Sequence, residues 1–158
     1  MPQITGLIHA CNHERQLGRA LVSLRLCDEV LVVDYGSTDG TLRIAREHGA
    51  RIIPAVQALE SGARNAGNDW ILCLLPCEII AEDLEASLLE WKTFDAVADQ
   101  IGYNVAIREQ IESEWQLLNA ELRLVNRKQV RWHNNLPDST ANAPIMPGYI
   151  LRIPNREN

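Results

Sequence analysis

Residues 28–50 read DEVLVVDYGSTDGTLRIAREHGA, and they carry the clearest indication of secondary structure in the chain. The run VLVVD at 30–34 is apolar up to its last residue, as expected of a strand covered on both faces. A polar turn, GSTDGT at 36–41, comes next, and it leads into a helix that ends at Gly49. The start of this helix offers three capping side chains, Ser37, Thr38 and Asp39. The stretch therefore predicts a strand, a loop and a helix in succession.

The same alternation continues on both sides of this stretch. Apolar or β-branched runs predict further strands at 4–10, 50–55 and 70–75. Apolar residues at helical spacing predict helices at 17–24 and 81–92. Strands that alternate with helices form a parallel sheet with right-handed crossovers. We therefore predict the α/β fold class, as a Rossmann-type three-layer sandwich with a mainly parallel sheet.

The remainder of the chain has a different pattern. Residues 102–109 and 121–132 are expected to be extended, and the second segment is expected to form a C-terminal hairpin around 126–129. Residues 137–158 contain four of the seven prolines, which predicts an extended wrap or a disordered end. We therefore expect one domain over 1–136 and a Pro-rich tail over 137–158.

Composition excludes several classes of protein. The chain has 158 residues, 46% of them apolar, and a net charge of −6, which argues against a nucleic-acid-binding surface. No apolar run approaches the roughly 20 residues of a membrane span, and no signal peptide is expected at the N-terminus. The four cysteines lack zinc spacing and indicate buried or reduced thiols. These features predict a cytoplasmic protein, and self-association into a homo-oligomer is left open.

Polar loops follow three of the predicted strands, at 11–15, 34–40 and 76–78. In an open α/β sheet, ligands bind outside the carboxyl ends of the strands. Asp34 can accept hydrogen bonds from a base or a ribose, and backbone amides at the helix start can hold a phosphate. The alternative is purely structural: Asp34 closes the turn, and Asp39 caps the helix. The residues by themselves leave both interpretations open.

The 28–50 stretch resembles the beginning of family 2 glycosyltransferases with the GT-A fold, most closely the branch that adds sugars to lipopolysaccharide cores. Nearly every position of that branch's signature is met. The resemblance extends over about 3–140 through three further segments, Asn12-His13-Glu14-Arg15, DWIL at 69–72 and RLVNRKQVRW at 123–132.

The resemblance implies an inverting transferase that uses a nucleotide-sugar donor. It implies that Asp34 contacts the base, and that Asp39 and the loop containing Asn12 and Glu14 shape the nucleotide pocket. Ser37 belongs to the same candidate donor site. Arg123 is a further candidate, either as a contact to the diphosphate or as an ion pair within the sheet.

The sequence departs from the family at two chemical positions. Where the family has Asp-Ala-Asp-Glu to hold a divalent metal, this chain has Leu75-Pro76-Cys77-Glu78, so we expect no metal and no other cofactor. Where the family has a His-Glu pair, this chain has Pro137 and Asp138. Asp138 is thus the candidate catalytic base.

Two functions follow as hypotheses. The first is sugar transfer from a nucleotide-sugar donor, weak or metal-independent, to an acceptor that the sequence does not identify. The alternative is a catalytically degenerate GT-A domain that binds a nucleotide, a sugar or a partner protein.

Overall fold

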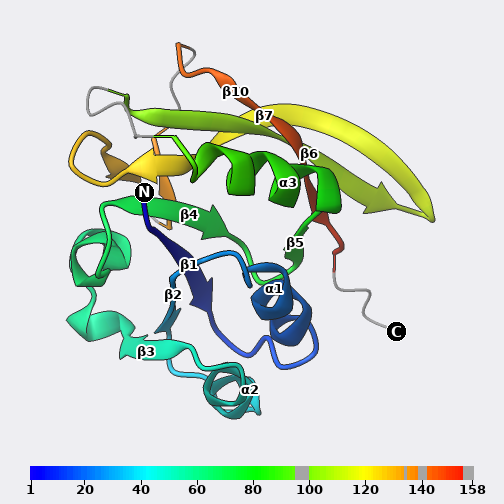
Figure 1. Ribbon diagram of the computed structural model, residues 1–158. Helices are drawn as coiled ribbons and strands as arrows, with labels where there is room; N and C mark the ends of the chain where they lie inside the picture. The colour runs from blue at the N-terminus through cyan, green and yellow to red at the C-terminus, as the bar shows by residue number, and fades with distance from the viewer. Residues whose placement is uncertain (95–99, 134, 139–141, 155–158) are drawn as a thin grey trace.

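An eight-stranded mixed sheet forms the centre of the computed structural model, which describes residues 1–94, 100–133, 135–138 and 142–154. The strand order is β3-β2-β1-β4-β7-β6-β10-β5 (Figure 1). The strands are β1 (Ile4–Ala10), β2 (Glu29–Asp34), β3 (Arg51–Pro54), β4 (Trp70–Leu74), β5 (Glu78–Ile80), β6 (Gly102–Ile111), β7 (Glu114–Asn126) and β10 (Ile145–Arg152). A separate ladder pairs β8 (Trp132–His133) with β9 (Leu136–Pro137).

Both faces of the sheet are covered. One face packs against the α-helices α1 (Leu17–Ser23), α2 (Thr41–Glu47) and α3 (Glu82–Trp91). The other face is covered by the β8–β9 ladder and by the 3₁₀ helices η1 (Ala55–Gln57) and η2 (Glu60–Asn65). This arrangement confirms the predicted α/β fold class. In the described part of the chain, no helix is both long enough and apolar enough to cross a membrane.

Strands β3, β2, β1 and β4 are parallel, so their carboxyl ends meet at one edge. These strands confirm the predictions at 4–10, 30–34, 50–55 and 70–75 to within one or two residues. Most residues of β1, β2 and β4 are buried on both faces, which is why these three strands are mainly apolar in sequence. The loops that leave this edge form the site described below.

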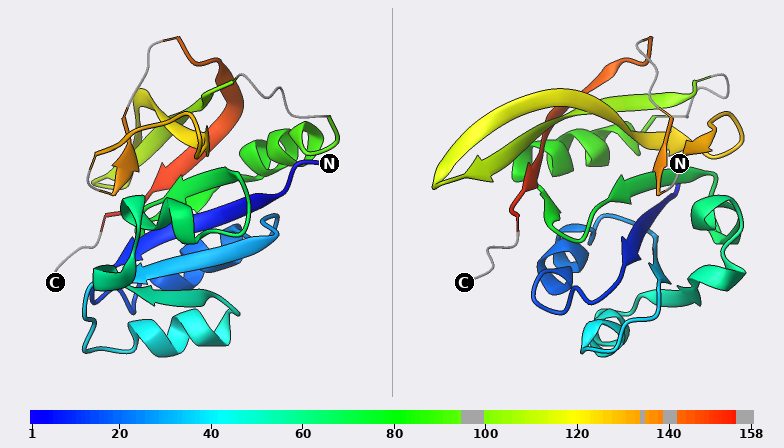
Figure 2. Two further views of the ribbon diagram at one scale, coloured as in Figure 1. Left: turned by 90° about the vertical axis from the view of Figure 1, so that its left-hand side faces the viewer. Right: turned by 180° about the vertical axis from the view of Figure 1, so that it is seen from behind.

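The C-terminal hairpin exists, but its predicted position at 126–129 is wrong. Strands β6 and β7 pair from Gly102↔Val125 to Ile111↔Glu114, so the turn is at Glu112-Ser113. Both turn residues have positive φ, 50° and 74°, as a two-residue hairpin turn requires. Neither is glycine or asparagine, so the usual sequence signal is missing. Figure 2 shows this hairpin arching over the other strands to a tip at one side.

This turn gives a prediction about stability. Replacing Glu112 by Asn and Ser113 by Gly should raise the free energy of unfolding by about 1 kcal/mol, because the new residues adopt positive φ with less strain. Urea unfolding measures the difference. As a control, Ser113→Pro fixes φ near −65° and should lower stability. Equal midpoints for the Asn-Gly variant and the original chain would contradict the assigned turn.

The segment expected as a Pro-rich tail contributes a strand to the main sheet. Strand β10 lies parallel to β6 and antiparallel to β5. Its pairing with β6 is interrupted between Met146 and Tyr149, where Pro147 needs no ladder hydrogen bond. At Gly148 a Cβ atom would lie 2.4 Å from the backbone of Leu84, so β10 packs directly on α3. The expected boundary at 136/137 therefore does not mark the end of the sheet; residues 139–141 and 155–158 lie outside the described part.

Candidate functional site

Five of the residues predicted from the sequence meet at the carboxyl edge of the parallel strands. They are carried by the loop after β1 and by the end of β2 with its following loop. Hydrogen bonds join the two loops directly. For example, the backbone N–H of Asn12 donates to Ser37 Oγ at 3.0 Å. The structure thus brings together Asn12, Glu14, Asp34, Ser37 and Asp39.

Asp34 is the last residue of β2 and is only 9% exposed. Its carboxylate accepts hydrogen bonds from the Gly36 amide at 3.1 Å and from Ser37 Oγ at 2.5 Å. It also lines a pocket of about 420 Å³ together with residues that include Arg46 and Pro54. Asp34 therefore closes the turn, as the structural interpretation held, and it also borders a pocket of the size that a ligand needs.

Asn12 and Glu14 fasten the first loop to the second. Asn12 has a φ of 57°, and its Oδ1 accepts from the Thr38 amide at 2.8 Å and the Asp39 amide at 3.3 Å. Glu14 Oε2 accepts from the Gly40 amide at 2.8 Å. Together with the bonds of Asp34, these contacts engage every backbone amide from 36 to 40. Side chains of the protein thus occupy the backbone donors that, in one of the two interpretations, would hold a phosphate.

Asp39 performs the capping role that the sequence offered as one alternative. Its Oδ1 accepts from the Thr41 amide at 2.9 Å and from the Thr41 hydroxyl, and Oδ2 accepts from the Glu14 amide. Partial desolvation would raise the pKa of Asp39, but these hydrogen bonds outweigh it and hold the pKa below its ordinary value. The carboxylate stays ionised and anchors the start of α2.

The loop junction can be tested at Asn12. Asn12→Ala removes the oxygen that accepts two amide bonds and forces alanine to a φ of 57°, so stability should fall by about 1–2 kcal/mol. Thermal or urea unfolding measures this loss. Asn12→Asp keeps both the acceptor and tolerance of that φ, and should remain near the original stability. Equal losses in the two variants would rule out the acceptor role.

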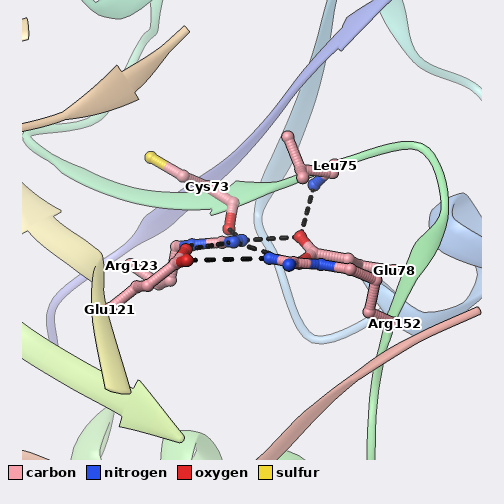
Figure 3. A network of polar contacts seen from close by, with 6 residues as sticks. All are labelled: Cys73, Leu75, Glu78, Glu121, Arg123 and Arg152. Atoms are coloured by element: carbon pink, nitrogen blue, oxygen red, sulfur yellow. Dashed lines mark hydrogen bonds and ion pairs between the residues drawn. The ribbon is translucent and has the colours of Figure 1, made fainter. Parts of the chain in front are cut away.

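A charged network fills the space between the end of β4 and the strands β5, β7 and β10 (Figure 3). Arg123 and Glu78 form its centre, and both side chains are 0% exposed. Arg123 Nη1 lies 2.6 Å from Glu78 Oε1, and Nη2 lies 3.0 Å from Oε2. Arg123 also donates to the Cys73 carbonyl at 3.2 Å. Of the two roles considered for Arg123, the structure places it in the ion pair.

Two further residues complete the network. Glu121 accepts from Arg123 at 2.7 Å, and Arg152 donates through Nε to Glu78 Oε2 at 3.1 Å. Burial alone would lower the pKa of Arg123, but the two carboxylates raise it above its ordinary value. Reasoning from the sequence missed Glu121 and Arg152. Glu121 lies two residues before Arg123 on the same strand, and residues two apart in a strand point to the same face. This spacing could have indicated that the two side chains are neighbours.

The residues at 75–78 do not fit a divalent metal. Glu78 is the one carboxylate among them, and its oxygens already accept from Arg123, Arg152 and the Leu75 amide. Burial raises the pKa of Cys77, so it stays a neutral thiol, which is a poor ligand for Mg²⁺ or Mn²⁺. Among the described residues, no group of three or more His, Cys, Asp or Glu side chains could hold a metal ion.

Asp138, the candidate base, lies exposed just after β9 and lines a pocket of about 340 Å³. Glu121 and His133 line the same pocket, and neither was predicted for it. The Asp138 amide donates to the Arg131 carbonyl at 2.8 Å, which holds its backbone in place. This segment reaches the strand-end loops, because Tyr35 donates to Asn135 at 2.8 Å.

The fold and the strand-end site define an α/β domain of the GT-A type. Residues 7–74 match the model for Glycosyl transferase family 2. The chain is 28% identical over 156 residues to an uncharacterised glycosyltransferase of Rickettsia typhi, covering 92% of this chain and 53% of that protein. A Rickettsia felis relative is 33% identical over 91 residues, covering 54% of this chain and 32% of that protein. The chain therefore spans about half, or less, of the length of these curated relatives.

A solved structure shares the fold. It is glucosyl-3-phosphoglycerate synthase from Mycobacterium tuberculosis in complex with Mn²⁺, UDP and phosphoglyceric acid. The TM-score is 0.51 at 22% identity, over 70% of this chain and 44% of that one. Residues 7–74 of this chain are thus similar to glycosyltransferase family 2, and the relatives and the shared fold agree with that similarity.

Proposed function

We propose that this chain binds a nucleotide-sugar donor at the carboxyl edge of the parallel strands. One observation carries the proposal: Asp34 ends a buried strand and borders a pocket beside two interlocked loops. A carboxylate in this position can accept hydrogen bonds from the N–H groups of a base. The fold is shared with a synthase whose structure holds UDP, which is consistent with a nucleotide donor.

Sugar transfer is the activity that the similarity to family 2 glycosyltransferases favours. In this proposal Asp138 accepts the proton of the acceptor hydroxyl, which attacks the anomeric carbon as the nucleoside diphosphate leaves. The charge on the leaving group is then offset by protein groups, because residues 75–78 do not fit a metal. Loss of a metal removes several kcal/mol of stabilisation of the leaving group, so we expect turnover to be slow.

The alternative is a domain that binds the donor without turning it over. Its support is that Leu75 and Cys77 stand where the family has metal-binding aspartates, and that Pro137 stands where it has the histidine of the His-Glu pair. In this alternative the donor pocket is retained for binding a nucleotide-sugar or for presenting a surface to a partner protein. The cytoplasmic location and homo-oligomer formation stay predictions from the sequence.

Calorimetry tests donor binding. The chain is titrated with UDP-glucose, GDP-mannose and dTDP-glucose, each with Mn²⁺ and each with EDTA. We expect one base to be preferred, with similar affinity in both conditions. No binding of any donor at millimolar concentration would refute the proposal. Release of free nucleoside diphosphate in the same samples separates slow turnover from binding alone.

A further inference from the structure

We propose that this chain binds the diphosphate of its donor without a divalent cation, and that Arg152 supplies the positive charge. The inference rests on the proposed donor binding and identifies the group that would contact the diphosphate.

The backbone amides are already engaged. Those from 36 to 40 donate to Asp34, Asn12 and Glu14, three side chains of the protein itself. A diphosphate at this edge would have to displace these bonds to use the amides. Its charge is therefore better met by a side-chain cation.

The position that resembles the family's metal site is also filled. Glu78 is 0% exposed and accepts from Arg123, Arg152 and the Leu75 amide. Breaking these bonds to admit a metal would leave two guanidinium groups without their central carboxylate, one of them fully buried. Such a loss is costly in a buried site. The network therefore occupies the position of the family's metal site and leaves no carboxylate there to bind a metal.

Arg152 is the cation of this network that reaches the surface. Its side chain is 19% exposed, whereas that of Arg123 is 0% exposed. The neighbouring residue ties it to the strand-end edge, because the Ile153 amide donates to the Cys77 carbonyl at 2.9 Å and the Ile153 carbonyl accepts from Gln16 at 3.4 Å. Arg152 thus lies where the loops after β1 and β4 meet.

The counter-ions allow Arg152 to take a ligand. Its second carboxylate contact, to Glu121, is loose at 3.7 Å, whereas Glu121 lies 2.7 Å from Arg123. Glu121 is also 39% exposed. A diphosphate can replace the loose contact while Glu121 keeps its bond to Arg123. The exchange leaves the buried pair of Glu78 and Arg123 in place.

The experiment compares nucleoside diphosphates with nucleosides, because only the former carry the group in question. UDP and GDP, and beside them uridine and guanosine, are titrated in EDTA. Arg152→Gln should lower the affinity for the nucleoside diphosphate that binds by tenfold or more. The affinity for the corresponding nucleoside should stay unchanged. Arg43→Gln neutralises an exposed arginine on α2 and is the matched control. It should change neither the affinity for the diphosphate nor the affinity for the nucleoside. Thermal unfolding confirms that each variant is folded.

A second variant keeps the test decisive if Arg152→Gln does not fold. Glu121→Gln removes the competing carboxylate from a half-exposed position and should strengthen diphosphate binding several-fold. The inference is overturned if EDTA abolishes diphosphate binding or if Glu121→Gln leaves the diphosphate affinity unchanged. It is also overturned if diphosphate binding is lost in Arg46→Gln, at the pocket beside Asp34, but not in Arg152→Gln. Absence of binding by all four ligands would instead refute the donor site itself.

Discussion

Replacing Arg123 by methionine is expected to lower the free energy of unfolding by about 3–5 kcal/mol. The variant leaves Glu78 in the interior without its bidentate partner at 2.6 and 3.0 Å, with only Arg152 to offset its charge. Since many domains are stable by only about 5–15 kcal/mol, this loss is a large part of the total free energy of unfolding. Urea unfolding followed by circular dichroism measures the loss.

A double variant separates the charge from the packing. Arg123→Met combined with Glu78→Met removes both charges of the buried pair, and it should recover most of the stability because two apolar side chains of similar size replace the pair. Arg43→Met breaks an exposed pair with Glu47 at 3.0 Å and should change stability by no more than about 0.5 kcal/mol. If the double variant is as unstable as the single one, packing and not charge explains the loss.

Replacing Asp34 by asparagine is expected to weaken donor binding by about 10- to 100-fold. The expectation follows from the loss of one hydrogen bond to a charged group, about 1.5–3 kcal/mol. The same substitution also affects folding. Asp34 accepts from the Gly36 amide, the Ser37 amide and Ser37 Oγ, and asparagine offers one acceptor oxygen instead of two. Stability should therefore also fall, by about 1–2 kcal/mol.

Paired titration and thermal unfolding measure the two effects of Asp34→Asn separately. Asp69→Asn is the matched control, because it removes a carboxylate just before β4, at the opposite edge of the sheet, where Asp69 pairs with Arg127 and Lys128. That variant should bind the donor as the original chain does. Unchanged affinity in Asp34→Asn would show that the nucleotide does not contact this carboxylate.

Local patterns were enough to predict the parallel half of the fold. In 28–50, the apolar run, the polar turn and the terminal glycine lie next to one another, and each is typical of one element. The same holds for β1 and β4, which are buried along their whole length, and for α3, whose buried residues Leu84 and Leu88 follow helical spacing. Because parallel strands end at one edge, the meeting of Asn12, Glu14, Asp34, Ser37 and Asp39 was also predictable.

The extended half was harder to predict because its signals are not local. The hairpin turn at Glu112-Ser113 lacks turn residues, and the pairing along β6 and β7 compensates for its strain. Strand β10 contains Pro147 and Gly148, which usually end a strand; here they lie at an interruption of the pairing, packed on α3. Both elements are stabilised by neighbours that are distant in the sequence.

The α/β fold, the strand-end loops and the resemblance to family 2 glycosyltransferases are all readable from the sequence, because strand, turn and capping preferences act between residues a few positions apart. The contacts of Glu78, Arg123 and Arg152, in contrast, depend on the tertiary fold. These residues are 29 to 74 positions apart, and nothing in the residues around any one of them indicates its partners. The curled sheet brings their strands together, and because a buried charge is stable only when paired, the packing determines which charges meet.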